Sequence, residues 1–580
     1  MSPRNITPAN AIWKHLDPRA TRLDAFRRRI NRSYNLDIKT YAQLHEWSVE
    51  YLEAFCQEAW AFLGIIYSVP PEKVASSLEN MWPRPEWFPG ARMNFTENIL
   101  APGLTAHPDS VAVSACHESR KWRHLTWVQL RDQVVLYVSA LEAAGVVAGD
   151  RIAGAIGAIF SSTAPDMGAE GIISRYTQIR PKILFVETEV LYAGKRRTLG
   201  NKIATAVDKL RERVPELSKV VVVNGAPLRD GLSDSVYYQY TTTGWMMWNL
   251  LVGSLSIGSR IVLYDGSPLY PSPAAQIGLL EEQDPKFLTA LKQSGWKGPS
   301  ALESLQVVVS AGSFLSPELF RWFYDNFPPE IGLFSGSGGT DLVGGIVTGN
   351  CLSPVFEGEI SAPQLGMKVE IYDNKGQNVD NTGREGDLII STPFFSMPVT
   401  FYGEDGLEKY RRAYFDKFPG VWCHGDFVKK NLDTGGYMIS GRSDGVLNPG
   451  GIRFGTAEVY SLVDKLPDVE DCIAVGQRRP NESDEQVLLF LKMKTATFNK
   501  TKQAIRDMIR EQLSPRHVPA HILEVKDIPY TLNGKKMESV VRDIVCKKRV
   551  GNLNSVANPE CLCEFEKFAK LPSTAASPKL

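Results

Sequence analysis

Apolar residues recur at helical spacing near the start of the chain. Residues 40–64, TYAQLHEWSVEYLEAFCQEAWAFLG, place Trp, Leu and Phe side chains three or four positions apart, which is typical of helices that bury one face. We therefore expect a helical N-terminal lobe over residues 1–75, packed on the main body of the protein. Core packing accounts for its aromatic side chains.

Short β-branched runs alternate with helical patterns through the middle of the chain. The segments KILFVETEV, KVVVVNG, SRIVLYDG and LQVVVSAG are strand-like, whereas TWVQLRDQVVLYVSALEAAG has the spacing of a helix. This alternation favours layers of helices on a sheet of parallel strands. The expected fold class is therefore α/β, with a large multi-layer domain over residues 76–440.

A different pattern follows residue 440. VEDCIAVGQ and EQVLLFLKMK are strand-like, and TKQAIRDMIREQL has the pattern of an amphipathic helix. The apolar face predicted for that helix consists of Ala504, Ile505, Met508, Ile509 and Leu513. We expect a small, mobile α+β domain over residues 441–548 and a tail containing Ser and Pro over residues 549–580.

Length and charge narrow the class of protein. A chain of 580 residues is too long for one ordinary hydrophobic core, so more than one domain is expected. Basic and acidic side chains number 65 each, which disfavours nucleic acid or an anionic membrane as the main partner, because both attract a basic excess. The sequence also lacks an uninterrupted apolar run long enough to span a bilayer.

Cysteine usage and the termini bear on location. The eight cysteines are scattered, and the spacing of Cys561 and Cys563 matches no usual zinc or redox motif. Reduced thiols and the lack of a signal-peptide core favour the cytoplasm. The last three residues, Pro578-Lys579-Leu580, differ at one position from the peroxisomal signal Ser-Lys-Leu, so the peroxisome stays an alternative.

The stretch from Ser440 to Tyr460, SGRSDGVLNPGGIRFGTAEVY, combines turn-forming residues with charged ones. Arg442 and Arg453 are permanent cations suited to phosphate or ribose contacts, and Asp444 lies between them. The glycines permit backbone conformations that other residues resist. We interpret the stretch as a hinge that also binds an anion, the alternative being a glycine-rich surface turn with solvated charges.

Two further segments carry groups suited to a nucleotide. Residues 335–341, SGSGGTD, are expected to form a loop of small residues that lines a phosphate, with Asp341 able to hold Mg²⁺. In residues 414–426, YFDKFPGVWCHGD, Asp426 could accept both hydroxyls of a ribose. His424 is more typical of a structural histidine. The alternatives are a flexible glycine loop and a solvated surface carboxylate.

A glycine turn near the end of the predicted small domain presents two lysines. It lies in residues 529–537, PYTLNGKKM, and offers Lys535 and Lys536. An ammonium group on such a turn could reach negative charge that develops on an acyl phosphate. An exposed basic turn without a catalytic role is the alternative.

Taken in order with TTTGWMMW at 241–248 and WFPGARMNF at 87–95, these segments resemble the adenylate-forming acyl-CoA synthetases, and among them the acetoacetyl-CoA synthetases. The resemblance covers roughly residues 10–560. It implies ATP-dependent, AMP-forming ligation of acetoacetate, or a related short carboxylic acid, to CoA. An acyl-adenylate and pyrophosphate form first; the small domain then rotates, and the thiol of CoA displaces AMP. ATP, Mg²⁺ and CoA are the implied cofactors and substrates.

The resemblance also implies roles for individual residues. Lys535, Thr340 and Arg453 would be catalytic, with Thr340 on the α-phosphate and Asp341 on the metal. Asp444 would be the hinge. The residues implied for binding of ATP or AMP are Ser310, Ala311, Gly312 and Ser313 at the adenine, Thr340 at the phosphate, and Asp426 and Arg442 at the ribose. The residues implied for the acyl pocket are Trp245, Met246, Met247 and Trp248.

One family feature is missing from the sequence. The Ser/Thr/Gly-rich loop of the form SSGTTGxPK, which cradles the β- and γ-phosphates of ATP, has no counterpart, because KVVVVNGAPLRDGLS runs directly into DSVYYQYTTTGW. Two smaller gaps lie in GDRIAGAIGAIFSSTAPD and EEQDPKFLTALKQSGW, and the first would remove a strand of the central sheet. Two explanations of these internal deletions stay open: coding segments lost from a mispredicted gene, or a degenerate enzyme.

Three interpretations of function stay open from the sequence. The first is the acetoacetate ligase, and the second is a ligase for a different carboxylic acid in specialised metabolism. The third is a catalytically impaired homologue that binds a nucleotide or CoA. The oligomeric state does not follow from these residues.

For the chain as written, we predict weak or absent formation of the acyl-adenylate, since the pyrophosphate leaving group lacks its cradle of backbone amides. ATP–pyrophosphate exchange with acetoacetate measures this step directly. Exchange as fast as that of a synthetase with the loop would contradict the prediction and show that the loop is dispensable.

Overall fold

The fold is described from a computed structural model. The structure describes residues 11–118, 122–147, 150–152, 159–162, 169–223, 236–238, 246–267, 305–311, 315–443, 454–477, 486–513, 517–531, 535–547 and 556–572, with single residues 270, 288, 292, 295, 447, 550 and 553. The chain divides into two compact units. The first comprises Met1–Val369, Ile390–Trp422 and Asp433–Gly436, and the second comprises Glu370–Ile389, Cys423–Leu432 and Tyr437–Leu580.

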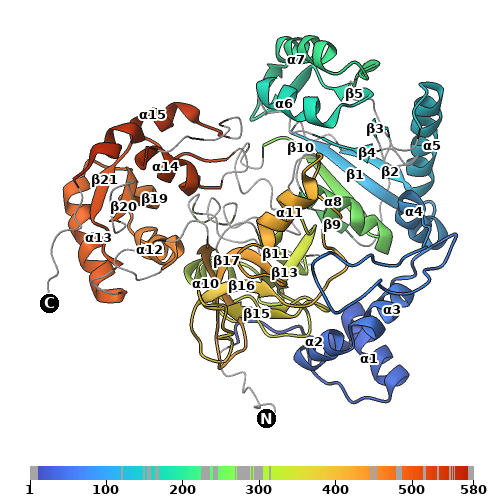
Figure 1. The fold of residues 1–580 in the computed structure, drawn as a ribbon, viewed down its shortest axis with the longest axis horizontal. Helices are drawn as coiled ribbons and strands as arrows, with labels where there is room; N and C mark the ends of the chain where they lie inside the picture. The colour runs from blue at the N-terminus through green and yellow to red at the C-terminus, as the bar shows by residue number, and fades with distance from the viewer. Residues whose placement is uncertain are drawn as a thin grey trace. The chain divides into compact units, whose positions relative to one another are not determined.

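Helices α1 (Arg22–Tyr34), α2 (Tyr41–Glu50) and α3 (Leu52–Leu63) follow the short turn η1 (Pro18–Ala20) and form the blue region of Figure 1. Helix α2 begins with a capping box, in which Thr40 and Gln43 bond each other's backbone amides. The apolar face predicted from the helical spacing is buried and includes Leu44, Trp47 and Phe55. The helical character predicted for this region is therefore present.

A four-stranded sheet in the first unit has the order β2–β1–β10–β9. It consists of β1 (Val111–His117), β2 (Trp122–Thr126), β9 (Val236–Tyr238) and β10 (Arg260–Asp265). Strand β10 pairs in parallel with both β1 and β9, as the sequence pattern predicted. The helices that share its core are α4 (Phe95–Ala106), α5 (Trp127–Ala143), α8 (Met246–Gly253) and η3 (Ser254–Ile257).

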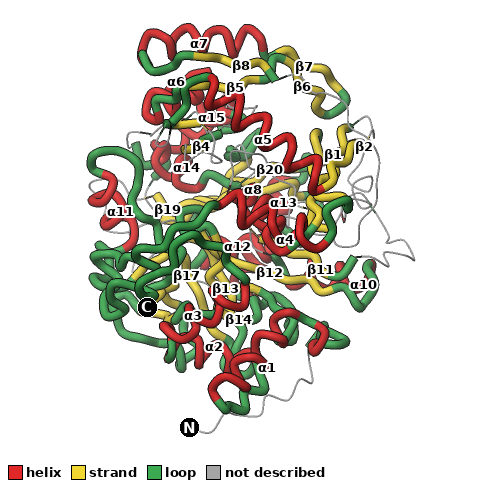
Figure 2. Tube along the Cα trace, turned by 90° about the vertical axis from the view of Figure 1, so that its right-hand side faces the viewer, coloured by secondary structure: helices red, strands yellow, loops and turns green. Residues whose placement is uncertain are grey.

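Smaller pairings surround this sheet. Strands β5 (Ile183–Val186) and β8 (Lys219–Val222) are parallel and share a core with α6 (Ala169–Ile179) and α7 (Gly200–Arg213). Figure 2 shows these four elements close together. The remaining pairs are β3 (Arg151–Ile152) with β4 (Ile159–Phe160), and β6 (Glu189–Tyr192) with β7 (Lys195–Thr198).

The carboxylate of Glu118 links the β6–β7 hairpin to the end of the larger sheet. It accepts bonds from the backbone amides of Ala193, Gly194 and Ser267, at 2.7, 2.8 and 2.7 Å. Burial opposes the charge of Glu118, but these three donors lower its pKa below the ordinary value. A buried anion is stable here because each of its nearest partners is an N–H group.

The remaining sheet of the first unit carries several predicted site residues. Its order is β11 (Val307–Ala311), β12 (Gly332–Gly339), β13 (Gly344–Thr348) and β14 (Ala362–Pro363). Helix α10 (Pro317–Asn326) packs against it through Leu319, Phe320 and Phe323. Helix α11 (Gly406–Tyr414) belongs to the same unit.

The second unit contains two sheets. The first has the order β15 (Val369–Tyr372), β16 (Gly386–Ile390), β17 (Trp422–Lys430) and β18 (Tyr437–Arg442). The other consists of β19 (Val469–Gln477), β20 (Gln486–Met493) and β21 (His521–Glu524). The helices packed around β19–β21 are α12 (Thr456–Val463), α13 (Phe498–Gln512), α14 (Glu538–Val545) and α15 (Leu562–Phe565), seen in orange and red in Figure 1.

Three details differ from the expectations. Residues 335–339, expected in a loop, are the end of strand β12, because β11 and β13 both pair with them and small residues allow close pairing. On helix α13, Ala504 is exposed, and Thr501 joins Ile505 and Ile509 on the buried face. The third difference concerns the segment after residue 549.

Part of the segment expected as a tail is packed into the second unit. The turns η7 (Pro559–Cys561) and η8 (Glu566–Lys570) flank α15. Phe565 is fully buried and meets Phe490 of β20 edge to face, with 4.9 Å between ring centroids. Aromatic burial of this size outweighs the polar composition that suggested a tail.

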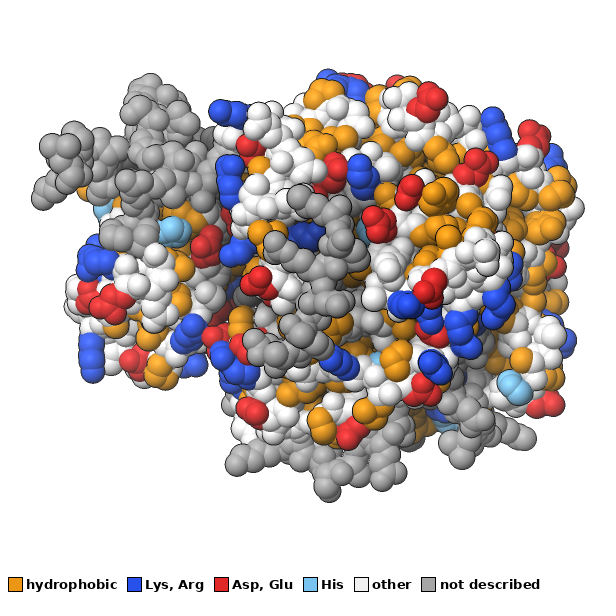
Figure 3. All heavy atoms as spheres, turned by 90° about the horizontal axis from the view of Figure 1, so that it is seen from below, with side chains coloured by type: hydrophobic (Ala, Val, Ile, Leu, Met, Phe, Trp, Pro, Cys, Tyr) orange, Lys and Arg blue, Asp and Glu red, His pale blue; other side chains and the backbone are white. Residues whose placement is uncertain are grey.

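The surface agrees with the balanced charge of the sequence. On the face drawn in Figure 3, basic and acidic side chains are interspersed. Among the described helices, none is both long and apolar enough to cross a membrane.

We predict that Phe565→Ala lowers the stability of the second unit by about 3–5 kcal/mol, because it opens a cavity against Phe490. Denaturant unfolding of the full chain, followed by a probe in that unit, measures the loss. Cys563→Ala is the matched control, since Cys563 lies on the same helix but is exposed. Equal unfolding curves for the two variants would contradict the packing of Phe565 into the core of the second unit.

Candidate active site

The pairing of β11 with β12 brings the first predicted group together. Ser310 lies opposite Ser335 and Ala311 opposite Gly336 in a parallel register. The carboxyl ends of the two strands therefore meet at one edge of the sheet, where open α/β sheets bind their ligands. Beyond β12, at that edge, the chain turns through Thr340 and Asp341.

Ser310 has an unsatisfied hydroxyl. Its side chain is fully buried, and among the residues that the structure describes its Oγ has no hydrogen-bond partner. Leaving a buried hydroxyl unpaired costs about 1–3 kcal/mol. The cost is offset if a polar ligand supplies the partner, which makes Ser310 a good candidate for contact with a nucleotide base.

Thr340 and Asp341 are both exposed, in a turn closed by a 3.2 Å bond from the amide of Val343 to the carbonyl of Thr340. Val343 adopts a positive φ of 50°, which is unfavourable for a β-branched residue. Its side chain is exposed, so packing does not explain the conformation. Backbone strain of this kind is typical of functional turns.

Gly338 allows this turn to approach the neighbouring strand, and Gly336 does not face the same constraint. A Cβ on Gly338 would lie 2.1 Å from the carbonyl oxygen of Gly344, which is backbone and has little freedom to move. A Cβ on Gly336 would lie 3.4 Å from the nearest atom, a methyl group of Thr348. The close approach at Gly338 therefore fixes the path of β12 just before Thr340.

Aromatic residues orient the carboxylate of Asp341. The hydroxyl of Tyr414 donates to Oδ2 of Asp341, and the Tyr414 ring stacks on Trp422 with centroids 3.6 Å apart. Burial raises the pKa of Tyr410 in the same aromatic cluster, and the nearby charge of Asp341 raises it further. A carboxylate held by one hydrogen bond and exposed on its other side is suited to a hard cation.

In the second unit, Asp426 of β17 is the register partner of Arg442 of β18. The Asp426 carboxylate is buried, and Nε2 of the equally buried His424 lies 3.7 Å from its Oδ2. That distance is too long for a hydrogen bond, so His424 packs beside this oxygen without bonding it directly. The sequence interpretation set His424 aside, whereas the structure makes it a neighbour of Asp426.

The two lysines of the glycine turn differ sharply in environment. Lys535 is exposed, and its backbone is held by Thr531 through bonds of 2.8 and 3.0 Å. The Lys536 side chain is only 18% exposed and forms an ion pair with Asp471 at 2.6 Å. Lys535 therefore has the mobility that a reaction group needs, and Lys536 does not.

Several predicted positions lie outside the described residues: Gly312, Ser313, Trp245, Asp444 and Arg453. For Arg442, the backbone position in β18 is described and the side chain is not. Met246, Met247 and Trp248 begin α8 and are half-buried. Trp248 packs against the core of the β1–β10 sheet, so core packing explains at least part of its position.

The structure thus groups the site residues within each unit. Ser310, Ala311, Thr340 and Asp341 belong to the β11–β12 edge of the first unit. The second unit pairs Asp426 with Arg442 and presents Lys535 near its other sheet. Sequence reasoning missed Tyr414 and Tyr410, although both stand in an aromatic run before Trp422 that signals a packed cluster.

Comparison with known families gives three matches in order along the chain. Residues 41–99 match the N-terminus of acetyl-coenzyme A synthetase, residues 222–398 match the AMP-binding enzymes, and residues 458–535 match the C-terminal domain of AMP-binding enzymes. Together they cover most of the predicted site residues.

The chain is also similar to individual proteins over nearly its whole length. It is 34% identical to an acetoacetyl-CoA synthetase from Xenopus tropicalis, with 98% of each chain covered. A malonamoyl-CoA synthetase from Penicillium aethiopicum is 32% identical, with 96% of this chain and 92% of the relative covered. The solved structure of an acetoacetyl-CoA synthetase from Streptomyces lividans matches with a TM-score of 0.87 and 27% identity, covering 97% of this chain and 99% of that one.

The alignment with the Xenopus protein spans 669 positions, whereas this chain has 580 residues, so at least 89 positions hold no residue of this chain. The comparison does not place these gaps along the sequence. The three internal deletions inferred from the sequence therefore stay predictions.

We predict that Gly338→Ala destabilises the first unit and displaces the Thr340 turn, whereas Gly336→Ala is tolerated. The new methyl group at position 338 collides with backbone, and overpacking of this kind costs about 1–3 kcal/mol. Thermal unfolding and binding of AMP, measured by calorimetry, check both effects. Equal behaviour of the two alanine variants would contradict the close approach described for Gly338.

Proposed function

Because the chain belongs to the acetoacetyl-CoA synthetase family of AMP-binding enzymes, we propose that it joins acetoacetate to CoA in an ATP-dependent, AMP-forming reaction. It is an acid–thiol ligase. The observation that carries the proposal is the near-complete coverage of both chains in these matches, which includes the segments that hold the phosphate, ribose and lysine groups.

In the first half-reaction, a carboxylate oxygen of acetoacetate attacks the α-phosphorus of ATP. A new P–O bond forms, the bond to the β-phosphate oxygen breaks, and pyrophosphate leaves. Thr340 donates its hydroxyl to the α-phosphate, and Lys535 and Arg453 balance the charge that develops there. These roles are supported by the exposure of Thr340 and Lys535 and by their place in the family's order of segments.

Different residues are assigned to the adenine and to the ribose of the nucleotide. Ser310 and Ala311, with Gly312 and Ser313, line the adenine, and the unpaired hydroxyl of Ser310 finds its partner there. Asp426 accepts hydrogen bonds from the two ribose hydroxyls, and Arg442, its register partner, supports it. A buried carboxylate fits this role, because hydroxyl donors form strong, charge-assisted hydrogen bonds to it.

Asp341 fits the role of metal ligand. It offers one exposed carboxylate, oriented by Tyr414, and Mg²⁺ is commonly bound by one or two carboxylates together with phosphate oxygens and water. When bound, the ion neutralises phosphate charge. The contribution of the chain is to orient the oxygen of Asp341, and Tyr414 does so with its hydroxyl.

In the second half-reaction, the thiol of CoA attacks the carbonyl carbon of the acyl-adenylate. The C–S bond forms, the C–O bond to AMP breaks, the thiol proton is released and AMP leaves. Lys535 must withdraw before CoA enters, because an ammonium at the α-phosphate serves only the first step. We assign Asp444 as the hinge that permits this change.

The substrate is a short acid with a carbonyl group at its third carbon. Acetoacetyl and malonamoyl, the acyl groups in the relatives' names, both have this feature and differ only in the group on that carbonyl, which is methyl in the first and amino in the second. Of the two, acetoacetate is the proposed substrate. Met246, Met247 and Trp248, with Trp245, offer an apolar wall that suits its methyl group.

All eight cysteines are free, and the charge of the chain is balanced. These features support a cytoplasmic location, because reducing conditions there keep thiols free.

We predict that the chain converts preformed acetoacetyl-adenylate and CoA into acetoacetyl-CoA even where ATP–pyrophosphate exchange is weak. The missing phosphate loop serves the β- and γ-phosphates, and the adenylate has neither. Thioester formation, measured by chromatography against a panel that includes malonamoyl-adenylate, tests both the reaction and the substrate.

Lys535→Ala is the internal comparison, since it should impair adenylation and spare the thioester step. Failure of the wild-type chain to form thioester from any adenylate in the panel would refute the proposed ligase. Preference for malonamoyl-adenylate would refute acetoacetate as the substrate.

A further inference from the structure

The ammonium group of Lys536 lies inside the second unit. Its Nζ is 2.6 Å from Oδ1 of Asp471 and 2.6 Å from the carbonyl oxygen of Cys472. It also lies over the ring of Tyr460, 4.2 Å from the centroid, which is a favourable position for a cation. A surface lysine does not require three such partners.

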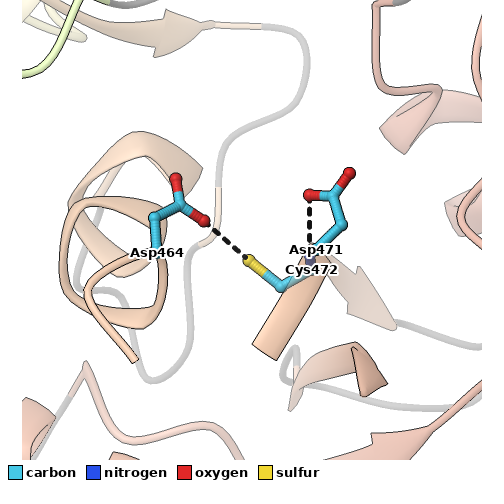
Figure 4. A group of neighbouring side chains, drawn as sticks. All are labelled: Asp464, Asp471 and Cys472. Atoms are coloured by element: carbon cyan, nitrogen blue, oxygen red, sulfur yellow. Dashed lines mark hydrogen bonds between the residues drawn. The ribbon is translucent and has the colours of Figure 1, made fainter. Parts of the chain in front are cut away.

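The charge of Lys536 is kept despite burial. Burial opposes the ammonium form, but Cys472, Asp471 and Asp464 outweigh it and raise the pKa above the ordinary value. One possible ligand atom each of Asp464, Asp471 and Cys472 lies within 4.8 Å of the other two, a spacing that a metal ion could also use. Figure 4 shows the three side chains. Because Lys536 already bonds Asp471 here, the protein supplies its own cation to this acidic group.

The same contacts join elements that are separate in the sequence. Tyr460 belongs to α12, the first helix after the predicted hinge. Its hydroxyl donates to Glu538 of α14 at 3.1 Å and accepts from the amide of Ala474 in β19 at 3.0 Å. Lys536 therefore connects the turn that carries Lys535 to β19, α12 and α14 through one buried network.

Adjacent residues of an extended chain point to opposite sides. Lys536 pairs with Tyr530 in an antiparallel bridge, which gives this short stretch an extended form. With the Lys536 side chain held inward, the Lys535 side chain is directed outward, and it is exposed. The burial of one lysine thus determines the side on which the other is presented.

We propose that Lys536 is a positioning residue, which anchors the turn so that Lys535 is presented for adenylation and moves rigidly with α12. The proposal rests on the proposed function, because the role of Lys535 belongs to it. The competing explanation is a buried ion pair that serves stability alone.

Two matched variants separate these explanations. Lys536→Met removes the ammonium and keeps a long apolar side chain. Lys182→Met is the control, since the Lys182 ammonium likewise has a carboxylate partner, Asp150 at 2.7 Å, and a backbone carbonyl partner, Gly145 at 2.6 Å, but belongs to the first unit. Both are assayed as full-length protein in the two half-reactions.

For Lys536→Met, we expect adenylation to fall about 100-fold, the loss typical of a catalytic group displaced by about 1 Å. Thioester formation from acetoacetyl-adenylate should change less than about threefold, because Lys535 does not serve that step. The control should leave both rates within about twofold. Equal loss in both half-reactions, with a matching fall in melting temperature, would overturn the proposal in favour of a stability role.

Hydrogen exchange provides a readout that does not need activity. In the wild-type chain, the amides of Thr531 and Lys535 are bonded within the turn, and Lys536→Met should raise their exchange at least about tenfold. Unchanged protection would refute the anchoring. If the wild-type chain shows no measurable adenylation, as its missing phosphate loop predicts, this exchange measurement alone decides whether Lys536 holds the turn. Failure of the wild-type chain in both half-reactions refutes the proposed function and leaves the exchange measurement as the same test.

A milder variant covers the case in which Lys536→Met does not fold. Asp471→Asn keeps the lysine and removes its carboxylate partner. We expect the same selective loss of adenylation, smaller in size, together with faster exchange at the turn. An effect on neither quantity would overturn the proposal.

Discussion

The parallel pairing of β11 with β12 is the constraint on which the first half of the site depends. It sets Ser310 beside Ser335 and carries the chain to Thr340 at the edge where both strands end. Antiparallel pairing of β12 with β13 then requires Gly338, because any side chain there would meet the backbone of Gly344. One sheet therefore provides both the buried hydroxyl and the exposed turn, and the strain at Val343 lies where the two requirements meet.

In the second unit, one lysine side chain is exposed while the lysine next to it in the sequence is largely buried. Lys535 and Lys536 are identical in charge, and only their surroundings assign them different tasks. Asp471 and the ring of Tyr460 hold Lys536 inside, whereas the exposed Lys535 side chain has no such contact among the described residues. A ligase with two steps needs a cation that can leave, and a fixed neighbour makes that departure a motion of the whole unit rather than of one side chain.

Sequence patterns predicted the elements well where apolar periodicity was long. VEDCIAVGQ is strand β19 from end to end, and the amphipathic pattern after residue 500 is helix α13. Residues 335–339 were expected in a loop because Gly and Ser carry no periodic signal; their strand form comes from neighbours on both sides. The orientation of Asp341 could not be predicted either, because its partner Tyr414 is distant in the sequence and only the fold brings the two residues together. The role proposed for Lys535 could be inferred from the sequence because its glycine turn is a local motif, whereas the anchoring role proposed for Lys536 depends on contacts with Asp471 and Tyr460.

The exposed apolar surface of the first unit is consistent with the gaps inferred from the sequence. Val135, Leu136 and Tyr137 of helix α5 are more than half exposed, and so is Val222 of β8. Among the described residues, β3 and β4 form a two-stranded sheet, and a pairing of this size is marginal without further strands or helices; β5 and β8 also form a two-stranded sheet, but they pack on α6 and α7. A complete central sheet would join such strands and cover their apolar faces. Loss of internal strands would leave strand edges and apolar side chains of this kind exposed, because the groups that paired with them or covered them would be gone.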